Sequence, residues 1–270
     1  MSEQRHHFTN ESLSLNQAHD YNLLLQINAN SFNYAITSNK QLLSWVENYP
    51  LDELKDPQAL RDILTANYKQ VIIGLASTGF TLLPNSLFDK DYVVDIARLL
   101  DVRDNEDVYF QQVNKYNIII YKVNQDLTAN LSDFDNPAVN YKAKGWITAI
   151  GNNEPADTNL YVNIEDDTAE FLNFSDANIR FYNTFTYTNH EELAYYTAFV
   201  AQELNLDAQN TTIVISGNVN QTDKCVTYLS EFYNEVKLNT IELLELPQSV
   251  DSHKILTLAA LLLCASSEEN

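Results

Sequence analysis

Apolar and polar positions alternate along residues 21–37, and the turn-forming sequence Asn-Ala-Asn-Ser at positions 28–31 divides the alternation into two halves. This pattern predicts a β-hairpin. Residues 42–46 add a third strand, and Asp56-Pro57 then places a capping residue before a proline at the first position of a helix. A short apolar strand at residues 71–73 follows. The expected order is therefore hairpin, third strand, helix and strand.

The same order returns in the second half of the chain. Residues 160–174 predict a hairpin around the turn Glu-Asp-Asp-Thr at positions 165–168, and residues 178–187 predict its third strand. Residues 188–191 (Thr-Asn-His-Glu) have the spacing of a capping box, and apolar residues recur at helical spacing after them. The apolar segment at residues 213–215 then matches the closing strand of the first half.

Similarity between the halves is clearest in their first strands, where NLLLQI at residues 22–27 is echoed by NLYVNI at residues 159–164. We therefore expect an internal duplication that forms two α/β lobes, each with a mixed β-sheet flanked by helices. The length of 270 residues agrees with about two domains. The expected parts are a flexible N-terminal segment (1–20), lobe I (21–150), lobe II (151–250), and a C-terminal helix with a short polar tail (251–270) that packs on lobe I.

The segments outside the repeat have weaker patterns. They predict a short strand at 81–84, a helix at 91–100, a strand pair at 107–113 and 116–123, mostly helix at 127–150, a helix at 226–232, an extended segment at 241–246 and a terminal helix at 252–265. The apolar run within that last helix is shorter than the about 20 residues needed to cross a bilayer. We therefore expect no membrane insertion.

The composition is strongly acidic, with 37 acidic against 16 basic residues and a net charge of −21. Binding to nucleic acid or to an anionic membrane requires clusters of Lys and Arg, and the chain has none, so we exclude these partners. The charge could steer a basic protein, although a solvated surface is the simpler explanation of it. Two distant cysteines and an N-terminus without a secretory signal predict a cytoplasmic protein.

The order of elements resembles the actin-like ATPase superfamily, which includes actin, sugar kinases and the pilus-assembly ATPase-like proteins. Residues 23–36, 80–88 and 251–258 are similar to a bacterial family of unknown function, DUF3822, whose members have an actin-like fold. The resemblance implies a duplicated actin-like (ribonuclease H-like) fold. In active members of the superfamily, ATP and Mg²⁺ bind in a cleft between the lobes.

The loops that bind nucleotide in active members depart from the pattern in this chain. Each hairpin turn of an active member carries Asp-x-Gly, because glycine lets backbone N–H groups approach phosphate and the aspartate orients Mg²⁺ or water. The first turn here has neither residue, and the second has no glycine. The adenosine-binding turn after residues 213–215 keeps one glycine. The candidate, vestigial nucleotide cleft therefore comprises Asn28, Asn30, Ser31, Glu165, Asp166, Asp167, Thr168, Ser216, Gly217 and Asn218.

Other chemistry has weaker support. Glu165, Asp166 and Asp167 could hold a divalent cation, although a solvated acidic turn is the simpler interpretation. No residue is assigned a catalytic role. Aromatic residues crowd one stretch, where they either pack between sheet and helix or, if exposed, serve a protein partner: Tyr182, Phe185, Tyr187, Tyr195, Tyr196 and Phe199.

We therefore expect a cytoplasmic pseudo-ATPase that acts as a binding or scaffold protein, has no cofactor, and has a protein partner of unknown identity if it has one. The alternative is an enzyme, a divergent ATPase or kinase that uses ATP and Mg²⁺. In that case Asn28, Ser31, Asp166, Asp167 and Gly217 would line its cleft.

Overall fold

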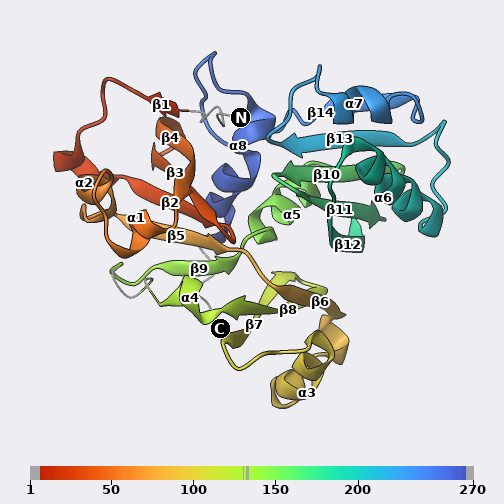
Figure 1. Ribbon diagram of the computed structural model, residues 1–270, viewed down its shortest axis with the longest axis horizontal. Helices are drawn as coiled ribbons and strands as arrows, with labels where there is room; N and C mark the ends of the chain where they lie inside the picture. Colours follow the sequence, from red (N-terminus) through yellow and green to blue (C-terminus); the bar gives the residue numbers. More distant parts are fainter. Residues whose placement is uncertain (1–6, 130, 132–133, 266–270) are drawn as a thin grey trace. The chain divides into compact units, whose positions relative to one another are not determined.

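The computed structural model describes residues 7–129, 131 and 134–265. Contacts divide the chain into two compact units (Figure 1). Unit 1 comprises the chain up to Thr148, Leu243–Pro247 and the chain from Leu258 on, and unit 2 comprises Ala149–Glu242 and Gln248–Thr257. The boundary between the units falls within the terminal helix, before Leu258.

Unit 1 is built on a six-stranded mixed sheet with the order β1-β4-β3-β2-β5-β9. The strands are β1 (His7–Thr9), β2 (Asn22–Ile27), β3 (Ser31–Ser38), β4 (Gln41–Pro50), β5 (Gln70–Leu75) and β9 (Ala138–Tyr141). Strands β2 to β4 are antiparallel, whereas β5 is parallel to β2 and β9 to β5. Five of the six residues in β2 and in β5 are buried, because both faces of these central strands are covered.

A second, three-stranded sheet also belongs to unit 1 and has the order β6-β8-β7. Its strands are β6 (Gly79–Pro84), β7 (Glu106–Asn114) and β8 (Asn117–Asn124). The helices of unit 1 are short: η1 (Leu15–Asp20), α1 (Asp52–Lys55), α2 (Arg61–Leu64), η2 (Asn85–Leu87), η3 (Lys90–Tyr92), α3 (Val93–Ala97), η4 (Arg98–Leu100) and α4 (Gln125–Thr128). The structure therefore contains the strand pair and the helix that we expected between residues 91 and 123.

Unit 2 has a five-stranded sheet with the order β12-β11-β10-β13-β14. Its strands are β10 (Asn159–Glu165), β11 (Thr168–Ser175), β12 (Asn178–Thr186), β13 (Thr212–Gly217) and β14 (Glu235–Leu238), and its helices include α6 (His190–Glu203) and α7 (Lys224–Leu229). These five strands have the same order and the same relative directions as β4-β3-β2-β5-β9 in the sheet of unit 1. Helices α5 (Lys144–Gly151), α8 (Ser252–Ala259) and η6 (Ala260–Cys264) complete the order of elements.

Two sequence-based predictions about strands were wrong. The stretch 127–150, expected as mostly helix, contains strand β9, which pairs with β5. The extended segment was expected at 241–246, whereas β14 lies at Glu235–Leu238 and only Glu245 makes an isolated bridge, to Gln41. Both strands have four residues and parallel partners distant in sequence, so their local pattern is weak.

Two helix starts differ from the prediction. The helix expected after Asp56-Pro57 is reduced to one turn, α2, and the Asp56 carboxylate instead accepts a hydrogen bond from the Gln58 side chain at 2.9 Å. Helix α6 is capped one residue later than expected, because Asn189 accepts from the Glu192 backbone N–H at 2.9 Å.

The N-terminal segment 1–20, expected to be flexible, holds regular structure where it is described. Strand β1 pairs with β4, and η1 follows it. Residues 1–6 lie outside the described residues. None of the helices in the described part of the chain combines the length and apolar character needed to span a bilayer.

Candidate functional site

The β2–β3 turn in unit 1 holds the first three candidate residues. The Asn28 backbone N–H donates to the Ser31 carbonyl at 2.8 Å, which closes the turn. Asn28 is half-buried and its side-chain oxygen has no hydrogen-bond partner, whereas Ala29 and Asn30 are exposed. Neither Ala29 nor Asn30 adopts a left-handed φ, so the turn forms without the glycine of an Asp-x-Gly motif.

The β10–β11 turn in unit 2 holds four more candidates, from Glu165 to Thr168. Asp166 adopts a left-handed φ of 50°, which aspartate tolerates better than most residues. Tyr187 braces the turn, since its backbone N–H donates to the Asp167 carbonyl at 2.8 Å and its hydroxyl to the Asp166 carbonyl at 3.1 Å. Burial first, then Cys225 and the two aspartates, raise the pKa of Tyr187 to about 12, so its hydroxyl remains a donor.

The acidic side chains of this turn follow one another along the chain rather than converging. Asp166 and Asp167 are exposed, and the Asn163 side-chain amide donates to Glu165 Oε1 at 3.3 Å. Within the residues that the structure describes, no three histidine, cysteine, aspartate or glutamate side chains are grouped so that they could hold a metal ion.

The last three candidates are Ser216 and Gly217, which end β13, and Asn218, which follows it; β13 is the strand parallel to β10. Gly217 has a φ of 97°, and a Cβ atom on it would overlap the Ile164 carbonyl oxygen and lie 2.8 Å from the carbonyl carbon. The Asn218 backbone N–H donates to this same Ile164 carbonyl at 2.9 Å. Unit 2 thus brings the two loops together at one end of the paired strands. The single glycine is required by the close approach of the backbones, whether or not a ligand binds.

Unit 1 makes the corresponding contact without glycine. Ile27 ends β2 and pairs with Leu75 at the end of β5, and the Ala76 backbone N–H donates to the Ile27 carbonyl at 2.9 Å. The candidate residues therefore fall into two groups, one in each unit. Both groups lie at the ends of central strands.

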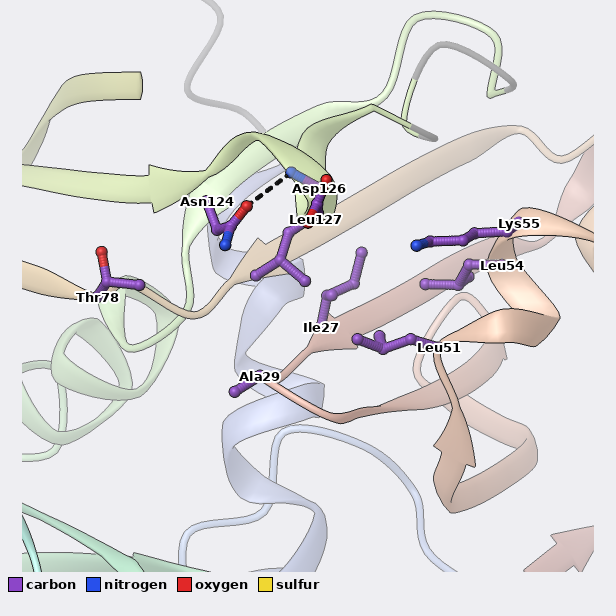
Figure 2. A pocket seen from close by; sticks show the side chains of 9 residues that line it. All are labelled: Ile27, Ala29, Leu51, Leu54, Lys55, Thr78, Asn124, Asp126 and Leu127. Atoms are coloured by element: carbon purple, nitrogen blue, oxygen red, sulfur yellow. Dashed lines mark hydrogen bonds between the residues drawn. The ribbon is translucent and has the colours of Figure 1, made fainter. Parts of the chain in front are cut away.

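Sequence reasoning missed a pocket of about 260 Å³ in unit 1, beside the β2–β3 turn (Figure 2). It is lined mainly by apolar side chains from the ends of β2 and β4, from α1 and from α4, with a few polar groups: Ile27, Ala29, Leu51, Leu54, Lys55, Thr78, Asn124, Asp126 and Leu127. Apart from Thr78, these residues lie in three short segments, 27–29, 51–55 and 124–127, that are distant from one another in the sequence.

The charged groups of the pocket are few and exposed. Figure 2 shows the Lys55 side chain reaching from α1 toward the pocket, with apolar side chains lying between it and Thr78 in this view. Asn124 is fixed as the cap of α4, because its side-chain oxygen accepts from the Asp126 backbone N–H at 2.9 Å. The interior of the pocket is therefore lined by apolar side chains, and its polar groups lie at the edge.

A buried ion pair supports the side of the pocket formed by Thr78. The Thr78 hydroxyl donates to Glu106, whose carboxylate also contacts Lys122 Nζ at 2.8 Å and accepts from the Arg103 backbone N–H at 2.9 Å. Burial would raise the pKa of Glu106, but the hydrogen bonds and the Lys122 ammonium outweigh it and lower the pKa to about 2. Lys122 also donates to the Asp101 carbonyl at 2.9 Å. The ionised pair holds β6, β7 and β8 together beside the pocket.

Comparisons with known proteins address the fold. The family model described as "Protein of unknown function (DUF3822)" matches residues 10–236. No curated protein sequence matches the chain. A Bacteroides thetaiotaomicron protein with an actin-like ATPase fold and unknown function is similar in structure, with a TM-score of 0.78 at 18% identity over 93% of this chain and 99% of that one. A chain of the PilM-PilN type IV pilus biogenesis complex gives a TM-score of 0.62 at 12% identity, over 90% and 96% of the two chains.

Proposed function

The chain belongs to the DUF3822 family and has an actin-like ATPase fold, and from this premise we propose that it is a non-catalytic binding protein whose unit 1 pocket holds an apolar segment of a protein partner. The observation that carries this proposal is the hydrocarbon lining of the pocket beside the β2–β3 turn. At this turn an active superfamily member would carry its first phosphate-binding motif.

The lining favours an apolar side chain over a phosphate. A phosphate placed against Ile27, Leu51 and Leu127 would lose its hydration with few donors to replace it, which is costly. Burying a leucine or phenylalanine side chain from a partner instead contributes about 1.5–3 kcal/mol. The pocket is also somewhat smaller than the roughly 300–1,000 Å³ of sites that enclose drug-sized ligands. A side chain or two of a peptide suits it better than a nucleotide.

The loops that would hold a nucleotide support the same proposal. The backbone conformation alone requires glycine at position 217. The turn at Asn28 closes through its own backbone hydrogen bond, and the turn at Asp166 is held by hydrogen bonds from Tyr187. The common strand order of the two sheets supports an internal duplication that kept the scaffold while the loops diverged. One of the similar structures is a complex of PilM with PilN, so a chain of this fold can take part in a protein assembly.

Thermal melting with ATP and with ADP, each with Mg²⁺, tests the proposal against the enzyme alternative. A ligand at about 100 times its dissociation constant adds about 2.7 kcal/mol of stability. We expect no rise in the melting temperature at millimolar nucleotide. A rise that Asp166→Ala abolishes would contradict the proposal and favour an ATPase or kinase.

Filling the pocket tests its use directly. Ala29 is exposed at the pocket, so Ala29→Trp places a ring there without disturbing the core. We expect proteins that co-purify with the tagged wild-type chain to be lost from Ala29→Trp and retained by Tyr116→Trp, a change at an exposed residue of unit 1 that does not line the pocket. Equal recovery of these proteins with both variants would show that they do not bind in the pocket.

A further inference from the structure

The outward face of helix α6 in unit 2 carries two exposed aromatic side chains. Tyr195 is 63% exposed and Phe199 is 43% exposed, although both are large and one is wholly apolar. They lie one helical turn apart, with ring centroids 6.4 Å apart and an angle of 16° between the ring planes. Their outer surfaces therefore form an aromatic step that is open to solvent.

This step rests on a continuous series of rings that leads into the core of the unit. The ring centroids of Tyr195 and Tyr196 are 5.5 Å apart, and Tyr196 stacks on Phe185 of β12 with a centroid distance of 4.8 Å. Phe185 in turn meets the fully buried Phe171 edge to face at 5.6 Å. The step is therefore held by the fold, and its own side chains would lose little conformational entropy when a ligand binds.

Acidic residues lie at both ends of the step. Glu192, Tyr195, Phe199 and Glu203 follow one another at intervals of three or four residues, so they form one stripe along α6. The sequence of α6, HEELAYYTAFVAQE, contains no lysine or arginine. Hydrogen bonds from Thr188, through its hydroxyl at 2.7 Å and its backbone N–H at 2.8 Å, lower the pKa of Glu192, so this end is negatively charged at neutral pH.

We propose that this stripe is a docking surface for an arginine-bearing, basic segment of a protein partner. A guanidinium stacks on exposed tyrosine and phenylalanine rings and also pairs with carboxylates, and it meets both groups along this stripe. A neutral apolar segment would cover Glu192 and Glu203 without supplying a counter-charge. The net charge of −21 attracts a basic segment and repels nucleic acid and anionic membranes. The surface lies in unit 2 and does not depend on the proposed use of the unit 1 pocket.

Fluorescence anisotropy with the full chain tests the surface. The probe is a labelled peptide in which arginine and leucine alternate, and the comparison peptide has citrulline in place of each arginine, which keeps the shape and removes the charge. The variants are Tyr195→Ala, Phe199→Ala and the double variant, with Tyr116→Ala as the control at an exposed tyrosine of unit 1. The substituted side chains are exposed, and circular dichroism of each variant verifies the fold.

We expect each α6 substitution to weaken binding of the arginine peptide by roughly two- to fivefold, with a larger loss in the double variant. The citrulline peptide sets the background, and Tyr116→Ala should bind the arginine peptide like the wild type. A peptide held only by the overall negative charge would bind wild type and double variant equally, and that result would overturn the proposal. Equal affinity for the citrulline peptide would overturn it too.

Discussion

Replacing Gly217 by alanine should destabilise unit 2 in the absence of any ligand. A residue other than glycine at a φ of 97° carries strain of about 1–3 kcal/mol. The added Cβ would also overlap the Ile164 carbonyl oxygen, and moving the loop away would break the 2.9 Å bond from the Asn218 N–H, a further loss of about 0.5–1.5 kcal/mol. We expect the free energy of unfolding to fall by about 2–4 kcal/mol.

Urea denaturation of the purified protein measures this loss. Both tryptophans, Trp45 and Trp146, lie in unit 1, so far-ultraviolet circular dichroism should be recorded beside fluorescence to follow unit 2. Gly151→Ala is the matched control, because a Cβ there would meet Phe174 at an ordinary distance of 3.5 Å and helix propensity favours alanine. A Gly217→Ala protein as stable as the wild type would refute the backbone explanation of this glycine.

Three further substitutions have expected outcomes that urea denaturation can measure. Ala177→Gly should stabilise the protein by about 1 kcal/mol, because alanine has a left-handed φ of 60° in the β11–β12 turn. Lys122→Met should destabilise it by about 3–5 kcal/mol, since it leaves buried Glu106 without its counter-ion. The pKa of Glu106 is lowered from 4.5 to about 2. Its ionised carboxylate therefore stabilises the folded protein above pH 4.5, and this contribution is lost as the pH falls toward 2. The free energy of unfolding of Lys122→Met should fall less steeply than that of the wild type across this pH range. Gly145→Ala should destabilise unit 1, because a Cβ there would lie 2.6 Å from the Ala260 carbonyl carbon.

The hairpins of both units could be predicted from sequence because the information is local. Residues 21–37 and 160–174 combine alternating apolar positions with turn-forming residues, and the structure confirms both hairpins. The fold class followed from the order of such elements, and the similar structures confirm it. Strand β9 has only four residues, and its place is set by pairing with β5, whose sequence is distant. A local sequence pattern does not predict the pairing of two strands that are distant in the sequence.

Only those parts of the candidate site that lie within a single segment of the chain could be predicted from the sequence. The turns at Asn28 and Asp166 lie at strand ends, as the spacing implied. The pocket combines Ile27, Leu51, Thr78 and Leu127, and each of these alone looks like an ordinary core or loop residue. The reason for glycine at position 217 depends on the Ile164 carbonyl of another strand, so sequence spacing could not separate a backbone role from a ligand role.

We have proposed that the unit 1 pocket binds a protein segment. The most direct test of this proposal is photo-crosslinking in cells of the source organism, with a photoreactive amino acid at position 29 and a matched one at position 116. We expect one discrete adduct, from position 29 only, joined through an apolar stretch of the partner as mapped by mass spectrometry, and lost when Leu51→Asp is added. The same adducts from both positions, or an adduct that Leu51→Asp leaves unchanged, would contradict it.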